Sequence, residues 1–159
     1  MAEYQPIENG RSYPILHARP VDGDTLDVTL DLGFGITVRR RVRMYGIDAP
    51  ETRTRDEEEK RFGTMTKDKL TWWCSQRATR RELRCPEPCS DKYGRVLGEL
   101  WWSHDDGACT NINKWLCDQA LAVPYRGQAR QTVQHLHLEN RKRLLQHPEG
   151  PIDDTPSST

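Results

Sequence analysis

Residues 21–45 read VDGDTLDVTLDLGFGITVRRRVRMY, and hydrophobic side chains in this stretch recur at every second position. From Leu26 to Leu30 they alternate with polar residues, and from Val38 to Met44 they alternate with arginines. A period of two is typical of a β-strand with one buried face, and the glycines between the two runs favour a turn. With the alternation extended back to residue 13, the stretch predicts three strands in a meander.

A longer hydrophobic period begins at Glu57. The side chains that share one helical face are Phe62, Met65, Lys69 and Trp73, with Gly63 as a tolerated weak point of the predicted helix. The spacing further predicts strands over Leu83–Cys85 and Val96–Trp102, and helices over Asn111–Gln119 and Gln128–Gln146. This α+β order is compatible with a small closed or partly open barrel, of which the five-stranded OB barrel is one form, although the pattern alone does not select it.

The chain has 159 residues, which suits one domain. We expect that domain over residues 11–147, with a flexible tail of polar residues at 1–10 and another, rich in Pro, Ser, Thr and Asp, at 148–159. No stretch reaches the ~18 consecutive apolar residues of a membrane span, and the first 20 residues lack the pattern of a secretory signal. We therefore expect a cytoplasmic protein that does not enter membranes.

Basic and acidic residues balance at 24 each, so the net charge expected of a general nucleic-acid binder is missing. The arginines nevertheless gather in two runs, one over 39–43 and one over 77–84, while the acids concentrate at 56–59 and in the C-terminal tail. Such runs fit a local basic surface beside an acidic pocket, and they fit equally a solvated charged face.

Five cysteines cannot all pair within one chain, and without a secretory signal we expect reduced thiols. Cys85 and Cys89 flank a Pro-Glu-Pro segment, but no second close pair of Cys or His residues accompanies them. The sequence therefore favours ordinary thiols over a structural zinc site.

Three carboxylates and one arginine fall where strands end and turns begin. They are Asp24, Asp48, Glu51 and Arg43, and the segment DKYGR at 91–95 adds a second arginine and an aromatic ring. Carboxylate oxygens suit a hard divalent cation, and a guanidinium beside such a cation shares the charge that develops on a phosphate diester under attack. Three desolvated acids would also repel one another by several kcal/mol unless a cation neutralised them.

Each of these pieces also has a structural explanation. Asp22-Gly23 is a turn signal, Glu51 suits the start of a helix, and Arg43 suits the solvent side of an alternating strand. No histidine falls within the three segments, so a zinc or histidine-base mechanism has no local support. We expect His135 and His137, on the last predicted helix, to be surface or partly buried structural residues.

Taken together, the segments resemble the signature of the staphylococcal nuclease family: V-D-G-D-T, then R-x-x-x-x-D-x-P-E, then D-K-Y-G-R. The resemblance covers about residues 13–145, in the same order and with similar gaps. It implies an α+β fold, an OB-type five-stranded β-barrel with three α-helices, which agrees with the predicted element order.

The resemblance also implies a role for each matching residue. Asp24, Asp48 and the backbone carbonyl of Ala49 would bind a divalent cation, calcium in the best-known relatives, with Mg²⁺ or Mn²⁺ as alternatives, and Asp22 would orient that site. Glu51 would act as general base or position the attacking water, while Arg43 and Arg95 would contact the scissile phosphate. The residues implied in nucleotide binding are Lys92, Tyr93 and Tyr125, although the loop around Pro124 does not align without a gap.

The function implied is that of a monomeric, calcium-dependent nuclease acting on DNA and RNA, preferring single-stranded regions and leaving 3′-phosphate ends. Little base specificity is expected from phosphate contacts and stacking. Two alternatives stay open: an OB-fold module that binds single-stranded nucleic acid without cutting it, and a structural or interaction domain whose pocket is incidental. The presence of Asp24, Asp48, Glu51, Arg43 and Arg95 favours catalysis.

Overall fold

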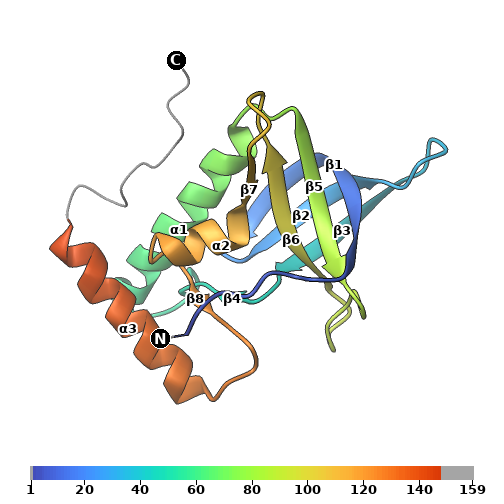
Figure 1. Ribbon diagram of the computed structural model, residues 1–159. Helices are drawn as coiled ribbons and strands as arrows, with labels where there is room; N and C mark the ends of the chain where they lie inside the picture. The colour runs from blue at the N-terminus through green and yellow to red at the C-terminus, as the bar shows by residue number, and fades with distance from the viewer. Residues whose placement is uncertain (1, 148–159) are drawn as a thin grey trace.

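The alternating stretch forms three consecutive antiparallel strands in the computed structural model, which describes residues 2–147 (Figure 1). They are β1 (Gly10–Asp22), β2 (Thr25–Asp31) and β3 (Thr37–Met44). β2 and β3 pair without a register shift, so the inward side chains of both strands stay on the core side throughout. Leu26 and Val42, which face each other in this register, are both fully buried.

Two further long strands complete a five-stranded barrel. β5 (Arg80–Pro86) pairs with the first half of β1, and β6 (Val96–Ser103) pairs with β5. β1 pairs with both β2 and β5. Its pairing with β2 has register irregularities after Ile15 and after Pro20, where a bulged strand can bend. A parallel pairing of β3 with β6 then closes the barrel, and β7 (Cys109–Asn111) extends the far side of β6.

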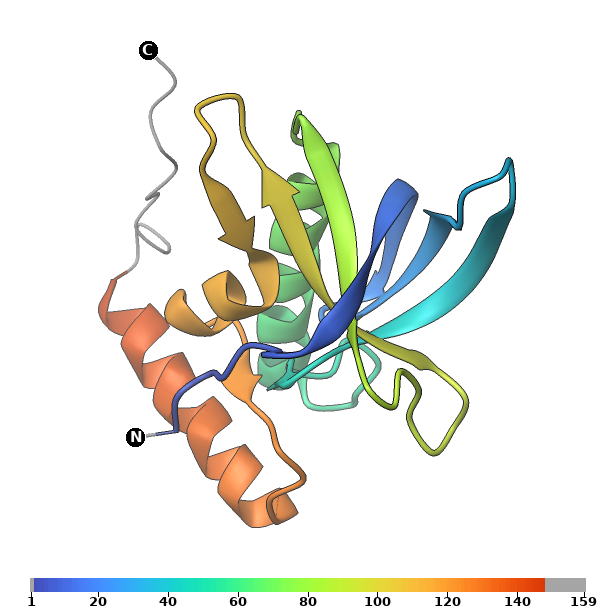
Figure 2. The same ribbon diagram turned by 45° about the vertical axis from the view of Figure 1, so that its right-hand side comes forward.

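Three helices pack around this barrel: α1 (Glu57–Ser75), α2 (Ile112–Asp118) and α3 (Arg130–Gln146). α1 begins at Asp56, whose side chain accepts the N–H groups of Glu58 and Glu59. Figures 1 and 2 place α3 at the end of the molecule opposite the tip of the β2–β3 hairpin. The interior side chains with no exposed surface include Leu70, Leu83, Leu100, Trp102, Ile112 and Leu116.

A separate two-stranded ladder lies between the barrel and α3. It consists of β4 (Ile47–Asp48) and β8 (Val123–Pro124), with Asp48 directly opposite Val123. The ladder joins the strand end that carries an expected site residue to the segment that leads into the last helix.

The structure confirms the predicted fold class, an α+β protein with an OB-type five-stranded barrel and three helices. The short strands β4, β7 and β8 were not predicted. The expected flexible tail at 1–10 is wrong for Tyr4 and Ile7, which are buried, and the Ile7 N–H donates to the buried carboxylate of Glu99. The expected tail at 148–159 lies outside the described residues. No helix within residues 2–147 is both long and apolar enough to cross a membrane.

Gly63 is not the weak point that the sequence predicted, because it lets α1 approach the loop after β4. A Cβ atom at this position would lie 2.6 Å from the backbone oxygens of both Pro50 and Glu51. Backbone atoms cannot move aside as the end of a flexible side chain can. The glycine therefore sets how closely the helix covers the loop that holds Glu51.

We expect Gly63→Ala to destabilise the protein by about 1 to 3 kcal/mol, since overpacking forces the helix and loop apart. In an unobstructed helix the same change would stabilise by about 1 kcal/mol, so the sign of the effect is informative. Urea unfolding of this variant and of Thr64→Ala, at the exposed neighbouring position, measures the difference. A stabilised Gly63→Ala protein would contradict the close approach.

Candidate active site

The expected site residues come together where the β1–β2 turn, the end of β3 and β4 meet. Asp22 and Asp24 lie at the β1–β2 turn, Arg43 lies near the end of β3, and Asp48 ends β4. Glu51 follows in the loop before α1. Strand ends and turns direct these polar groups toward one another, since the barrel interior is filled by apolar side chains.

Arg43 lies between the two acids expected to bind a cation. Its Nη1 is 3.2 Å from Oδ2 of Asp24, and its Nη2 is 3.2 Å from Oδ1 of Asp48. The side chains of Arg43 and Asp24 are each only 14% exposed, so the ion pairs are partly shielded from solvent. Two carboxylates thus face one positive group.

Asp24 is the most enclosed acid of the site. Its carboxylate also accepts the N–H of Ala49 at 2.8 Å and the hydroxyl of Thr25 at 3.1 Å. Burial nevertheless raises the pKa of Asp24 above its ordinary value, against the opposing effect of Arg43, and the nearby charge of Asp48 raises it further.

Asp22 organises the turn itself. Its Oδ1 accepts the hydroxyl of Thr52 at 2.9 Å and the N–H of Gly23 at 3.0 Å, which joins the β1–β2 turn to the loop after β4. A Cβ atom on Gly23 would lie 2.9 Å from that of Ala49, so the glycine lets the two segments touch. These contacts agree with an orienting role for Asp22.

Glu51 lies beside this group and is exposed. Partial burial raises the pKa of Glu51, and the negative charges of Asp22, Asp24 and Asp48 raise it further, in that order. A carboxylate whose proton affinity is increased in this way is better suited to accept a proton from water.

The second arginine and the expected nucleotide-binding residues form a separate group. Arg95 donates through Nε to Asp91 at 2.8 Å, and its guanidinium lies 5.5 Å from the ring centroid of Tyr93, over which Lys92 also lies. Within residues 2–147, no hydrogen bond or ion pair joins this loop to the three acids. Tyr125 lies between β8 and α3, where it lines a cleft with Tyr45, residues 5–9 and the start of the β5–β6 loop.

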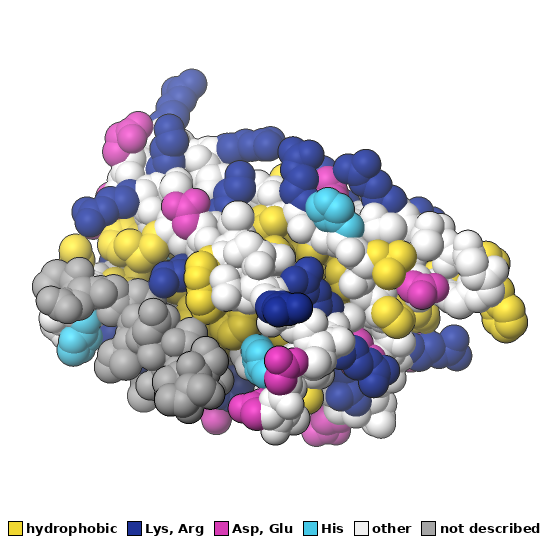
Figure 3. Space-filling model, turned by 90° about the horizontal axis from the view of Figure 1, so that it is seen from above, with side chains coloured by type: hydrophobic (Ala, Val, Ile, Leu, Met, Phe, Trp, Pro, Cys, Tyr) yellow, Lys and Arg dark blue, Asp and Glu magenta, His cyan; other side chains and the backbone are white. Residues whose placement is uncertain are grey.

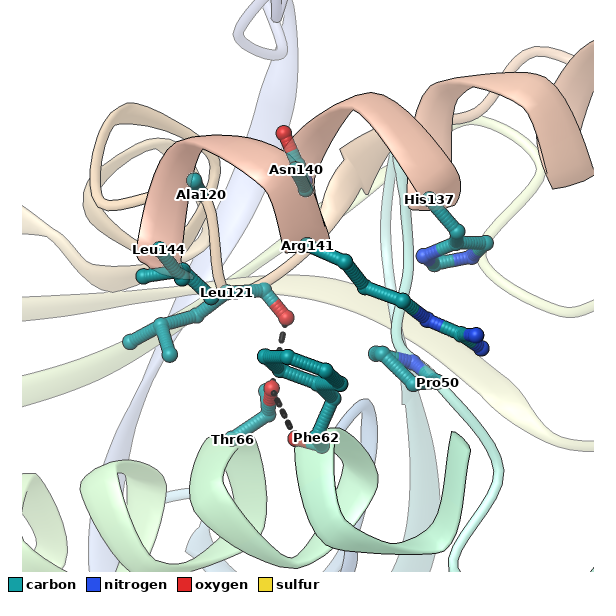
Figure 4. A pocket seen from close by; sticks show the side chains of 9 residues that line it. All are labelled: Pro50, Phe62, Thr66, Ala120, Leu121, His137, Asn140, Arg141 and Leu144. Carbon is teal, nitrogen blue, oxygen red and sulfur yellow. Dashed lines mark hydrogen bonds between the residues drawn. The ribbon is translucent and has the colours of Figure 1, made fainter. Parts of the chain in front are cut away.

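His137 is the site residue that the sequence did not reveal. Its Nε2 is 2.8 Å from Oδ2 of Asp48, although 89 positions separate the two residues. Figure 4 shows His137 and Arg141 projecting from α3 beside Pro50, and both residues line the same pocket. The signal available in the sequence was the position of His137 four residues after the hydrophobic Val133, on the same helical face.

The donor set fits a hard divalent cation held in part by water. Among the described residues no group of three Cys, His, Asp or Glu side chains is arranged to hold a metal by itself. Asp24 and Asp48 nonetheless direct one oxygen each toward a single positive group, and the crowded acids need a positive charge among them. Two carboxylates completed by a backbone carbonyl and waters suit Ca²⁺ or Mg²⁺.

Comparison with known proteins finds a matching family and two similar proteins. The sequence model of a family described as "Staphylococcal nuclease homologue" matches residues 41–145, which includes Arg43, Asp48 and Glu51 but begins after Asp24. Protein ParB of Escherichia coli is 32% identical over 130 residues, or 79% of this chain, and Micrococcal nuclease of Shigella flexneri is 31% identical over 112 residues, or 68% of it. The chain spans only 65% and 56% of the lengths of these two relatives.

With a chelator present, we expect Asp24→Asn to raise the melting temperature near pH 8. The raised pKa means that ionised Asp24 weakens the folded state at pH values above that pKa. The gain should be about 2 to 4 °C if the cost is about 1 kcal/mol, and it should shrink as the pH falls toward about 4, where the aspartate becomes protonated in both states.

Asp27→Asn is the matched control, because the hydrogen bond from Arg41 lowers the pKa of Asp27. A lowered pKa stabilises the folded state above the unfolded pKa, so this variant should gain nothing near pH 8. Equal shifts of the melting temperature in the two variants would show that burying the ionised Asp24 side chain does not destabilise the folded state.

Proposed function

The chain belongs to the staphylococcal nuclease family, and from this premise we propose that it is a calcium-dependent phosphodiesterase that hydrolyses DNA and RNA. The observation that carries the proposal is the pair of carboxylates, Asp24 and Asp48, that share the Arg43 guanidinium beside Glu51. A binding module has no need to bring acids together where a nucleic-acid phosphate would be repelled. Acidic side chains at a phosphate site are instead expected in a metal-dependent enzyme, where they bind a cation that stabilises the charge of the reacting phosphate.

In the proposed reaction, Asp24, Asp48 and the Ala49 carbonyl would hold a calcium ion, which would supply positive charge to the phosphate when bound. Glu51 accepts a proton from the attacking water, and its raised pKa favours that transfer. Arg43 and Arg95 donate hydrogen bonds to the phosphate oxygens as charge develops on them. The water oxygen forms a bond to phosphorus while the bond from phosphorus to the 5′ oxygen breaks. The departing oxygen takes a proton from solvent, which leaves a 3′-phosphate end and a 5′-hydroxyl end.

Basic side chains on the outer face of the barrel favour a polyanionic substrate. Arg39 and Arg41 lie on the same face of β3 as Arg43, and Arg19 lies across the sheet on that face, opposite Asp27. Although the net charge is zero, Figure 3 shows Lys and Arg side chains gathered along one edge of the face seen from above. Arginine and lysine side chains bind the phosphates of a nucleic acid whatever its base sequence.

The substrate form follows from the side chains available for stacking. Tyr93 is 72% exposed on the β5–β6 loop, and Tyr125 is 39% exposed and lines a cleft together with Glu87 at the start of that loop. Exposed rings stack unpaired bases, so we propose that single-stranded regions are preferred. We also propose that a monomer is sufficient for cleavage.

The deciding experiment measures cleavage of single-stranded DNA and RNA with calcium and with a chelator. We expect cleavage with calcium, with 3′-phosphate products, and none with the chelator. Binding without cleavage would support the non-catalytic OB-fold module instead, and neither binding nor cleavage would leave a structural domain.

Glu51→Gln should lower kcat roughly a hundredfold or more and change KM much less, because it removes the proton acceptor but keeps the shape of the side chain. Calcium affinity, measured by titration calorimetry, should stay close to that of the parent. A variant that lost affinity for the substrate while keeping its turnover would make Glu51 a binding residue.

Arg43→Lys and Arg95→Lys should each lower kcat by roughly 10²- to 10³-fold, since lysine keeps the charge but loses the planar pair of donors. The matched control is Arg80→Lys, because Arg80 is 66% exposed at the start of β5 and is not among the arginines of the proposed substrate face. Rates within threefold of the parent for Arg43→Lys or Arg95→Lys, at saturating calcium, would remove that arginine from the catalytic group.

A further inference from the structure

His137 approaches the site from the buried face of α3. It lies four residues after Val133, the buried residue of the helix, and three before Asn140, whose side chain donates to the Ala122 carbonyl at 3.0 Å. Its own side chain is only 11% exposed. His137 thus occupies a fixed position against the loop that follows β4 and does not extend into solvent.

Contacts C-terminal to His137 attach α3 to the rest of the molecule. Arg141 pairs with Glu58 of α1 at 3.4 Å, and its guanidinium lies 5.7 Å from the ring centroid of Phe62. Arg143 donates to the Asp118 carbonyl at 3.0 Å. The helix is therefore attached both to α1 and to the end of α2, and Figure 4 shows His137 projecting from it beside Pro50.

The carboxylate of Asp48 is held from two sides as a result. Oδ2 is paired with His137 Nε2, and Oδ1 is paired with Arg43. Arg43 also contacts Oδ2 of Asp24, so Oδ1 of Asp48 and Asp24 share one guanidinium, whereas Oδ2 of Asp48 is paired with His137. Asp48 itself is 31% exposed, and without His137 its carboxylate could rotate about the Cβ–Cγ bond.

We propose that His137 is a positioning residue, which holds Asp48 so that its Oδ1 alone is presented to the cation of the active site. This inference rests on the proposed function, in which Asp48 is a calcium ligand. Carboxylates that bind metals are commonly held by a hydrogen bond from a neighbouring group, and loss of that partner typically lowers metal affinity by roughly 10- to 100-fold. The Nε2 of His137 is paired with Asp48 and is therefore not itself a ligand of the cation in this arrangement.

The test is calcium affinity, measured by titration calorimetry on the whole protein without nucleic acid. We expect His137→Ala to bind calcium roughly 10- to 100-fold more weakly than the parent. His137→Gln, which keeps a donor of similar reach, should restore affinity to within about threefold. His135→Ala is the matched control on the same helix, because His135 is 71% exposed and pairs only with Glu139 among the described residues.

Melting temperatures with a chelator separate positioning from folding. If His137→Ala melts well below the parent, His137→Leu decides, because it fills a pocket lined by Phe62, Leu121 and Leu144 while removing the donor. Weak calcium binding by a stably folded His137→Leu protein, with rescue by His137→Gln, supports the proposal.

Two results would overturn the inference, and they differ in what else they overturn. Parent-like calcium affinity in His137→Ala or His137→Leu, in a protein that binds calcium and cleaves DNA, would reject the role of His137 and leave the proposed function intact. A parent protein that neither binds calcium nor cleaves nucleic acid would reject both.

Discussion

Three residues of parallel pairing between β3 and β6 hold the barrel closed, and the geometry of the site depends on this seam. Arg43 lies within it, opposite Thr25 on one side and Leu97 on the other. The side-chain amide of Asn113 reinforces the seam by donating to the carbonyls of Tyr45 and Gly98. A guanidinium mounted on a strand bonded along both edges has little freedom, which is what a group that stabilises developing charge requires.

That rigidity gives Arg43 two compatible tasks. Without a cation it offsets part of the negative charge of Asp24 and Asp48. In the proposed reaction Asp24 and Asp48 would hold a cation, so the donors of Arg43 would be free to bind the phosphate. The same positive group would then stabilise the resting fold and the transition state in turn.

The local features of the fold could be predicted from the sequence, and the contacts between distant segments could not. Alternation is a property of a strand by itself, so the strands that flank Asp24 and the strand that carries Arg43 were predicted correctly. His137 was predicted as a structural residue, because helical spacing identifies the face of a residue but not its partner 89 positions away. Gly63 was misread for a related reason: a backbone oxygen from another segment leaves no mark on the local pattern.

Because α3 buries little of its surface, it can detach under conditions in which the barrel stays folded. Only Val133 of this helix is buried, whereas the barrel strands carry fully enclosed side chains. Partial opening should therefore detach α3 while the barrel persists, and amide hydrogens of α3 should exchange with solvent before those of β2 and β6. The protein would then lose activity at a lower temperature than the one at which the barrel unfolds. The attachment of α3 would set the highest temperature at which the protein is active.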